Sequence, residues 1–289
     1  MEVQLLLYDN ARAFLEGAGE MLYSRETVNN LMLGVNEQLI NDPQAYKDPF
    51  FATVVDETGS LQLAAVMTPP HNIILAGGDD FEVGLPVLIS YLQDEKIQVP
   101  GVIGPVHITE HFVKAWKRMR RQNHTISMRQ RVYELRKVRM PPLPPGQFRL
   151  AEMGDGDTIA GWLASYENEV MEELGEDHDG RARKSIDNGS VFVWDKSEEI
   201  VSMAMAIRPI AHSITISGVY TPPEFRRNGY ASALVARLSQ KLLDQGYHFV
   251  NLFTDLGNPV SNAIYQKIGY HPVSDFRMIR FKGKIKDGN

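Results

Sequence analysis

Apolar and polar residues follow two different periods along the first half of the chain. Residues 1–41 place apolar side chains three and four positions apart, which predicts two or three helices. Two apolar runs, at 50–55 and 61–67, flank the polar turn 56–60, and this pattern predicts a β-hairpin. The other elements expected in this half are a strand at 73–76, a helix at 83–93, a short strand at 102–103, a helix at 109–121 and a long strand or bent hairpin at 125–138.

The second half of the chain repeats this plan after a proline-rich stretch. Residues 140–147 read MPPLPPGQ and are typical of a stiff, extended linker. We therefore expect two domains, residues 1–140 and 148–289, joined by a linker at 141–147. The elements expected in the second half are a strand at 148–151, helices at 158–174 and 180–187, a hairpin of 191–194 with 200–208, a strand at 212–220, a helix at 231–243, a strand at 249–254, a helix at 259–268 and a final stretch at 272–282.

Two proline-containing segments indicate that the halves are related. VMTPPHNIIL at 66–75 and AIRPIAHSITI at 206–216 share the order strand, proline, histidine, strand. Such self-similarity favours a degenerate tandem repeat. The expected fold class is therefore α/β, with two domains that each form a twisted mixed β-sheet flanked by helices.

The stretch SGVYTPPEFRRNGYAS, residues 217–232, predicts an anion-binding site. It reads as a strand, a basic turn and the start of a helix. Gly229 lets the backbone approach a ligand closely, and the free N–H groups of the following helix point back at the turn. Arg226 and Arg227 add positive charge. A surface helix start with two solvated arginines would look similar, and a dinucleotide fingerprint is excluded because G-x-G-x-x-G is absent here.

A second stretch, LFTDLGNPVSNAIYQKIGY at 252–270, places polar side chains on one helix face. Asn258, Asn262 and Tyr265 are separated by four and then three positions. Two interpretations stay open at this point. The three side chains line a ligand site, or Asn258 caps the helix and Tyr265 is a half-buried aromatic residue.

The order of strand, R-x-x-G-x-A turn and helix resembles the acyl-coenzyme A signature of the GNAT superfamily of N-acetyltransferases. The second stretch resembles the asparagine-rich helix of that family, with its tyrosine and a K-x-G-Y ending at Lys267, Gly269 and Tyr270. The resemblance covers the chain from about Phe148 onward, and the first half only in its pattern of elements. The coenzyme-binding residues that it implies are Val219, Tyr220, Thr221, Arg226, Arg227, Asn228, Gly229, Tyr230, Ala231, Ser232, Asn258, Asn262 and Tyr265.

The resemblance implies a reaction in which acetyl-coenzyme A donates its acetyl group to a primary amine of a small molecule or a protein. Tyr265 is then the acid that protonates the departing thiolate, and backbone groups at Val219 and Tyr220 bind the thioester oxygen and the pantetheine arm. The general base is left open, with Asp255 or a water chain as candidates, because the central strand offers serine and threonine where many relatives have glutamate. The alternative is a non-catalytic acyl-coenzyme A binding or regulatory protein.

The first half differs from the second where the anion site would be. Its strand at 73–76 is followed by Gly77, Gly78, Asp79, Asp80, Phe81 and Glu82. Three carboxylates there would repel a pyrophosphate. We therefore expect residues 1–140 to be a degenerate GNAT-like domain without a coenzyme site, and residues 148–289 to be the catalytic domain.

Composition removes several other function classes. The chain of 289 residues has a net charge of -6, which argues against nucleic acid as a main partner. It has no cysteine, which excludes disulfides and a cysteine acyl-enzyme and fits a cytoplasmic location. The start of the sequence has no basic region typical of a secretory signal, and no apolar run approaches membrane-spanning length. The acceptor, the acyl chain length and the oligomeric state are left open.

Three charged segments have weaker interpretations. His107 to His111 spells H-x-x-E-H, but Pro105 and a cap at Thr109 would start the helix between the histidines, which disfavours a metal site. The basic run 114–139 fits a solvated helix and strand, a contact with the second domain or nucleic-acid binding. An acidic segment is either a solvated helix or a mouth that attracts cationic amines, and consists of Glu167, Glu169, Glu172, Glu173, Glu176, Asp177 and Asp179.

Overall fold

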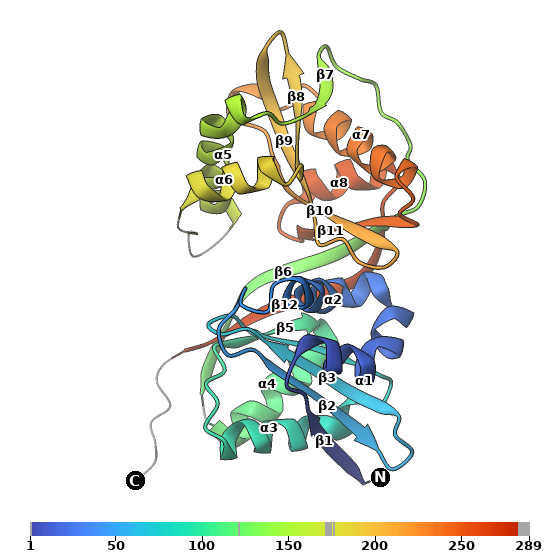
Figure 1. The fold of residues 1–289 in the computed structure, drawn as a ribbon, viewed down its shortest axis with the longest axis vertical. Coiled ribbons are helices and arrows are strands. Elements are labelled where there is room, and N and C mark those ends of the chain that lie inside the picture. Colours follow the sequence, from blue (N-terminus) through green and yellow to red (C-terminus); the bar gives the residue numbers. More distant parts are fainter. Residues whose placement is uncertain (1, 121, 171–174, 176, 283–289) are drawn as a thin grey trace. The chain divides into compact units, whose positions relative to one another are not determined.

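The structure, a computed structural model, describes residues 2–120, 122–170, 175 and 177–282 (Figure 1). It divides into two compact units. Unit 1 holds the described residues of 1–132, 255–257 and 273–289, and unit 2 holds those of 133–254 and 258–272. Each unit is therefore built from separate stretches of the chain.

Unit 1 is organised on a mixed sheet in the order β1-β2-β3-β4-β5-β12. Neighbouring strands are antiparallel, except that β4 and β5 are parallel. The strand β12 comes from the end of the chain, and its residues 276–280 pair with all of β5. The strands are β1 (Val3–Leu7), β2 (Phe50–Asp56), β3 (Leu61–Met67), β4 (Ile73–Gly77), β5 (Gly101–Pro105) and β12 (His271–Lys282), and β6 (Asn123–Leu135) lies next to β12.

Alternating residues of these strands reach helices on both faces of the unit 1 sheet. Ala52 and Val54 of β2 belong to the cluster that includes residues of α3 and α4, whereas Phe51, directly before Ala52, packs against Phe14 of α1. This two-sided burial explains why the strands read as nearly continuous apolar runs. The helices are α1 (Ala11–Ser24), α2 (Glu26–Asn41), the short η1 (Phe81–Gly84), α3 (Leu85–Asp94) and α4 (Val106–Arg120).

Two expectations for unit 1 were wrong. Residues 1–41 contain not only helices but also β1, whose five residues are too short for periodicity to identify and which becomes a strand by pairing with β2. The helix α4 begins at Val106, so His107 and His111 lie on one helix. Thr109 does not cap it, because its hydroxyl donates back to carbonyl oxygens of the preceding turn.

Unit 2 has the same succession of strand directions. Its sheet runs β7-β8-β9-β10-β11, antiparallel except for the parallel pair β10 and β11, and the end of β6 follows. This repetition confirms the tandem plan expected from the sequence. The strands are β7 (Gln147–Leu150), β8 (Val191–Lys196), β9 (Glu199–Ile207), β10 (Ser213–Tyr220) and β11 (Phe249–Asp255).

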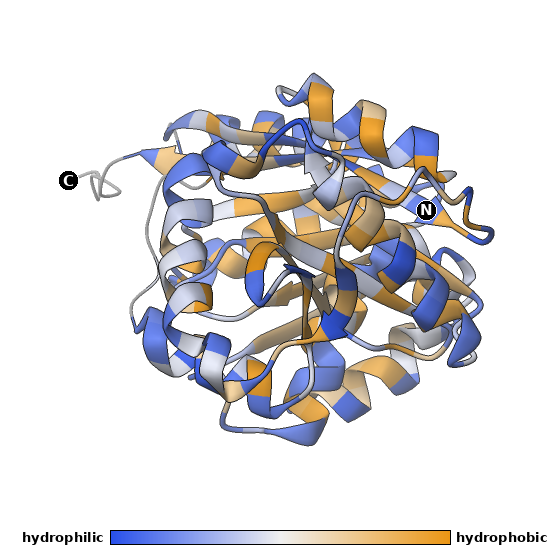
Figure 2. Cartoon of the chain, turned by 90° about the horizontal axis from the view of Figure 1, so that it is seen from above, coloured by the Kyte–Doolittle hydropathy of each residue, from blue (hydrophilic) through white to orange (hydrophobic). Residues whose placement is uncertain are grey.

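Helices cover both faces of the unit 2 sheet, with α5 and α6 on one side and α7 and α8 on the other (Figure 1). Phe192 and Trp194 of β8 pack in the cluster of α7 and α8, and Val191 and Val193 pack in the cluster of α5 and α6. Apolar and hydrophilic bands alternate along the helices, as amphipathic helices on a sheet require (Figure 2). The helices are the short η2 (Met153–Asp155), α5 (Gly156–Val170), α6 (His178–Asp187), the short η3 (Pro223–Phe225), α7 (Tyr230–Asp244) and α8 (Pro259–Ile268).

The compact units differ from the division expected from the sequence in two places. The chain enters unit 2 at Tyr133, before the proline-rich stretch, and Val273 and the described residues after it return to unit 1. The domain limits 1–140, 141–147 and 148–289 therefore stay a prediction. Among the described residues, none of the helices is long and apolar enough to cross a membrane.

Candidate active site

The parallel strands β10 and β11 pair only near their beginnings. Their described register joins Ser213–Ile216 to Phe249–Leu252 and ends there. On the opposite side, the register of β10 with β9 shifts between Ser217 and Tyr220. Gly218 lies in this bulge with φ +59, and a Cβ at that position would meet the Met205 sulfur at 3.0 Å. Both the positive φ and the close approach of Met205 favour a glycine in this bulge of β10.

Hydrogen bonds fix the backbone at the end of β10. The Ser202 hydroxyl donates to the carbonyl oxygen of Tyr220 over 3.1 Å, and it shares a 2.8 Å bond with the hydroxyl of Thr221. Val219 lies within the bulge and packs its side chain against the main core of unit 2. Of the two residues expected to bind the pantetheine arm, Tyr220 thus already has a protein partner at its carbonyl oxygen, as has the hydroxyl of Thr221.

The basic turn ends at a glycine that begins a helix. Gly229 is the N-cap of α7, adopts φ +83 and supplies no side chain to the cap. A Cβ at this position would have no atom within 4 Å, so the space beside Gly229 is open. The N–H groups of Tyr230, Ala231 and Ser232 therefore form a helix start without a side-chain cap, which carries partial positive charge.

The two arginines of the turn have different roles. The guanidinium of Arg226 donates from Nη2 to Glu169 over 2.6 Å and from Nε to the carbonyl oxygen of Thr221 over 2.9 Å. It also lies over the ring of Tyr220, 5.8 Å from the centroid. Arg227 is exposed at φ +66 and makes no ion pair with a described residue. The unengaged cation of the turn is thus Arg227.

The neighbouring residues shape the turn. The Asn228 amide donates to the carbonyl oxygens of Phe225 and Arg226, at 3.1 and 3.2 Å. Tyr230 is buried and its ring packs in the core, so its backbone N–H is the part that faces the turn. Within the predicted stretch 226–232, the side chains of Arg226 and Asn228 therefore bond backbone carbonyl oxygens of the turn.

Both asparagines of α8 have structural hydrogen bonds. Asn258 is the N-cap, and its side-chain oxygen accepts from the N–H of Ser261 over 3.1 Å. Asn262 donates to the carbonyl oxygen of Asn258 over 2.7 Å and accepts from the hydroxyl of Tyr133 over 2.9 Å. The cap that the sequence left open as an alternative is thus present. Tyr133 was missed, because no sequence pattern relates a residue of β6 to α8.

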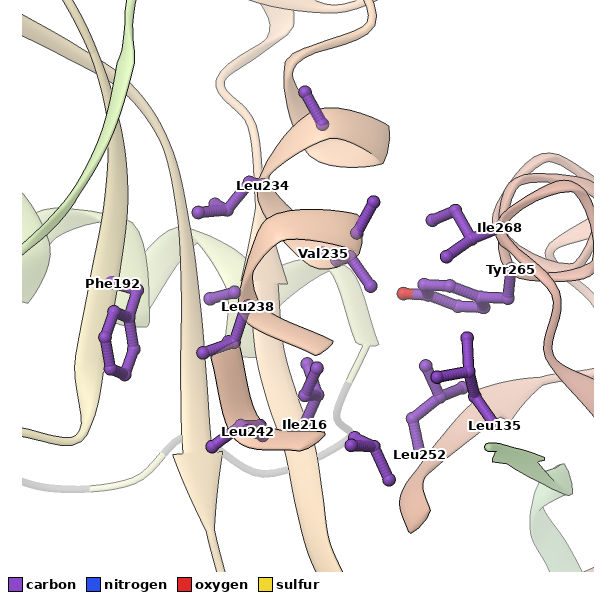
Figure 3. Packing of buried hydrophobic residues seen from close by; sticks show 14 of the residues in the cluster. Leu135, Phe192, Ile216, Leu234, Val235, Leu238, Leu242, Leu252, Tyr265 and Ile268 are labelled. Carbon is purple, nitrogen blue, oxygen red and sulfur yellow. The ribbon is translucent and has the colours of Figure 1, made fainter. Parts of the chain in front are cut away.

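Tyr265 projects from α8 toward α7 and is surrounded by apolar side chains, among them Leu135, Val235 and Leu252 (Figure 3). It is 8% exposed. Burial raises the pKa of this phenol, and the nearby phenol of Tyr166 raises it further. No hydrogen bond joins the Tyr265 hydroxyl to another described residue. The group is therefore protonated at neutral pH and has a proton to donate.

The two described glutamates of the acidic segment, Glu167 and Glu169, are both paired with arginines. Glu167 is 5% exposed and accepts hydrogen bonds from Arg181, His178 and the N–H of Gly175, at 2.6, 2.9 and 2.8 Å. Burial opposes its charge, but these bonds outweigh burial and lower the pKa of Glu167 to about 2. Glu169 pairs with Arg226.

Two further members of the acidic segment lie at the start of α6. Asp177 caps α6 by accepting from the N–H of Gly180 over 2.9 Å, and Asp179 is exposed in the first turn of the same helix. Glu172, Glu173 and Glu176 lie outside the described residues.

The polar residues of β10 are engaged in a buried network. The Thr215 hydroxyl donates to Asn251 over 2.7 Å, and the Asn251 amide donates to the Ser213 hydroxyl over 3.2 Å. Asp255 accepts from the N–H of Gly257 over 2.8 Å in its own turn. These contacts identify no group as a general base.

In unit 1, the position that corresponds to the anion site lies at the end of β4, and Phe81 fills it. A Cβ on Gly77, at the end of β4, would lie 2.5 Å from the Cβ of Phe81, because Phe81 folds back against the strand end. The Phe81 ring is buried and packs against the rings of His107 and His111, with ring centroids 5.3 and 5.5 Å apart. His111 also approaches Glu82 at 3.2 Å. No cluster of three or more metal-ligating side chains occurs in the described part of the chain.

Comparison with known proteins identifies the family of the second unit. The sequence of residues 142–270 matches the acetyltransferase (GNAT) family. These residues are a GNAT acetyltransferase domain. No curated protein matches the chain in sequence.

Solved structures share the fold over nearly the whole chain. A GNAT-family acetyltransferase from Colwellia psychrerythraea is 9% identical with a TM-score of 0.59, covering 97% of this chain and 100% of that one. A GCN5-related N-acetyltransferase from Sphaerobacter thermophilus is 15% identical with a TM-score of 0.59, covering 96% and 95%. A tandem GNAT protein from the clavulanic acid biosynthesis pathway is 11% identical with a TM-score of 0.57, covering 98% and 99%. The tandem GNAT-like architecture expected from the sequence is thereby confirmed.

Proposed function

We propose that the GNAT domain transfers an acetyl group from acetyl-coenzyme A to a primary amine. The observation that carries this proposal is the uncapped start of α7 at Gly229, directly after the bulged end of β10. An N-terminal helix start with open space before it suits a phosphate group. The family supports acyl transfer in general. Acetyl-coenzyme A as the donor and a primary amine as the acceptor are part of this proposal.

The described residues fit the parts of the coenzyme. The diphosphate would accept hydrogen bonds from the N–H groups of Tyr230, Ala231 and Ser232, with Arg227 as an unengaged cation. Val219 in the bulge would pair its backbone with the pantetheine arm. The absence of a side chain at Gly229 suits this arrangement, because a side chain there would project into the space that the diphosphate needs.

The proposed reaction is a direct displacement on the thioester. The amine nitrogen forms a bond to the acetyl carbon, negative charge builds on the carbonyl oxygen, and the carbon–sulfur bond breaks. The hydroxyl of Tyr265 gives its proton to the departing sulfur and is later reprotonated from solvent. The hydroxyls of Ser213 and Thr215 are engaged in hydrogen bonds with Asn251, so we propose that the amine loses its proton to water.

The coenzyme would bind to the second domain alone. In the first domain Phe81 fills the space beside the end of β4, and Glu82 adds a carboxylate next to it. Both features disfavour a diphosphate at that position. We therefore propose one coenzyme for each chain.

The acceptor is less defined than the donor. A mouth that attracts cationic amines was one of two interpretations of the acidic segment, but Glu167 and Glu169 are each paired with an arginine. An ion-paired carboxylate attracts a cation less than a free one does. The described carboxylates therefore give little reason to require a second positive charge on the amine substrate.

The alternative is a non-catalytic acyl-coenzyme A binding or regulatory protein. The engaged side chains of β10 favour it, since no carboxylate takes the place of a base there. This alternative shares the coenzyme site with the proposed enzyme and differs in the absence of turnover.

The test uses the full chain with acetyl-coenzyme A and a mixed library of amines, and measures free thiol. We expect thiol release that depends on at least one amine and disappears in Gly229→Glu. Coenzyme binding without thiol release across the library would favour the binding protein. Failure of the chain to bind coenzyme A at all would overturn both interpretations.

A further inference from the structure

Arg226, the arginine of the R-x-x-G-x-A turn, is held by a residue of another element. Its Nη2 donates to Glu169, in the last turn of α5, over 2.6 Å. Its Nε donates a 2.9 Å hydrogen bond to the carbonyl oxygen of Thr221. In this conformation the guanidinium is fixed between α5 and the end of β10.

We propose that Glu169 is a positioning residue that competes with the coenzyme diphosphate for Arg226. This inference rests on the proposed function, because it assumes that the diphosphate binds at the start of α7. Arg226 and the Gly229 N-cap belong to the same short turn, three positions apart. Coenzyme binding then exchanges the Glu169 carboxylate for a diphosphate oxygen on the guanidinium.

The exposure of the pair supports an exchange. The side chains of Arg226 and Glu169 are 43% and 46% exposed. Ion pairs between such exposed groups contribute little to stability, so the pair can open at small cost. A diphosphate offers more negative charge and a geometry that guanidinium groups bind in a bidentate manner. The exchange is therefore favourable, although the initial pair reduces the net affinity for the coenzyme.

This competition predicts that removal of the negative charge of Glu169 tightens coenzyme binding. Glu169→Gln keeps the size of the side chain and removes its charge, so Arg226 becomes available to the diphosphate. We expect the Kd of coenzyme A to fall by about two- to fivefold, the range that an exposed ion pair supplies. Inorganic pyrophosphate should show a tightening in the same direction, because it carries the diphosphate alone.

A matched control separates the pair from general electrostatics. Glu224 is an exposed carboxylate two positions before Arg226. Glu224→Gln changes the net charge by the same amount in the same turn, and we expect it to change the Kd much less. Equal tightening in both variants would show that only the overall field of the turn matters, and would overturn the proposal.

A double-mutant cycle tests whether Glu169 acts through Arg226. Arg226→Gln alone should weaken coenzyme binding, and Glu169→Gln should have no further effect when combined with it. A merely structural pair would instead lower the melting temperature and leave the Kd unchanged or higher. An unchanged Kd in Glu169→Gln overturns this inference while leaving the proposed function intact. If the unaltered protein binds no coenzyme, the proposed function fails and this inference fails with it.

Discussion

The hydroxyl of Tyr133 donates a 2.9 Å hydrogen bond to the side-chain oxygen of Asn262. The same hydroxyl accepts from the amide of Gln266 over 3.2 Å, so one phenol of β6 contacts two successive turns of α8. Tyr265 lies between these two residues in the sequence. The orientation of the proposed acid therefore depends on a strand that is far from it along the chain.

Tyr133→Phe should destabilise unit 2 without removing the ring from the core. The change deletes both hydrogen bonds, and we expect the free energy of unfolding to fall by about 1–2 kcal/mol, because the amides of two α8 residues lose a partner. Chemical denaturation measures this loss. Tyr247→Phe is the control, since no described residue hydrogen-bonds the hydroxyl of Tyr247. Equal stability of the two variants would show that the Tyr133 bonds do not hold α8.

Gly229→Glu should weaken coenzyme A binding by at least about 30-fold, the loss of one or two charge-assisted hydrogen bonds. The substitution places a side chain and a negative charge before α7 and strains the backbone at φ +83. Isothermal titration calorimetry gives the affinity and the number of sites. Gly246→Glu is a closely matched control, because Gly246 has φ +103 and equally open space at the other end of α7. Normal affinity in Gly229→Glu would remove this turn from the site.

Tyr265→Phe should lower the turnover number by a factor on the order of 10², because general acids contribute 10² to 10⁴. Coenzyme affinity should stay close to normal, since the ring and its packing are kept. Turnover, coenzyme Kd and melting temperature are measured on one preparation. A loss of only about twofold with intact folding would fit a tyrosine that packs, and leaving-group protonation would then pass to water.

The pH dependence of stability should depend on Glu167. Its pKa of about 2 in the folded protein lies below the ordinary value of 4.5. The stabilisation is therefore fully present above about pH 4.5 and is lost as the pH falls toward 2. Denaturation of the unaltered protein at pH 7 and pH 3 should show this loss, on the order of 2 kcal/mol for a buried, hydrogen-bonded carboxylate.

The control for this prediction is the neutral variant. In Glu167→Gln the titrating group is gone, so the difference in stability between pH 7 and pH 3 should be smaller than in the unaltered protein. Glu169→Gln, which changes an exposed carboxylate two positions away, should keep the original difference. An identical difference in all three proteins would show that Glu167 does not govern the acid sensitivity.

Local patterns in the sequence were sufficient for most elements and for the family. The hairpin of β2 and β3, the helix α7 and the glycine turn before it were predicted because each depends on the spacing of neighbouring residues. The resemblance rested on two short stretches, the turn with Arg226, Gly229 and Ala231 and the helix that ends at Tyr270. Periodicity and turn chemistry are properties of a short window, so they can be read without the fold.

The pairing of distant segments could be decided only by the tertiary structure. The strand β1 is too short for its pattern to be recognised, and β12 pairs with β5 of unit 1 although the sequence placed these residues in the second domain. Both outcomes depend on which sheet edge is available to a strand. An edge is formed by residues far away in the chain, and no local pattern records it.

The roles of individual site residues also required the fold. Arg226 and Arg227 are adjacent and were both predicted to bind the coenzyme, yet one is held by Glu169 of α5 and the other makes no ion pair with a described residue. Asn262 carries the spacing of a ligand residue, but Tyr133 of β6 occupies its side-chain oxygen. A hydrogen bond or an ion pair needs two partners within about 3 Å. The sequence by itself determined which groups could bind an anion or donate a proton, and the packing of separate elements decided which of those groups are already engaged.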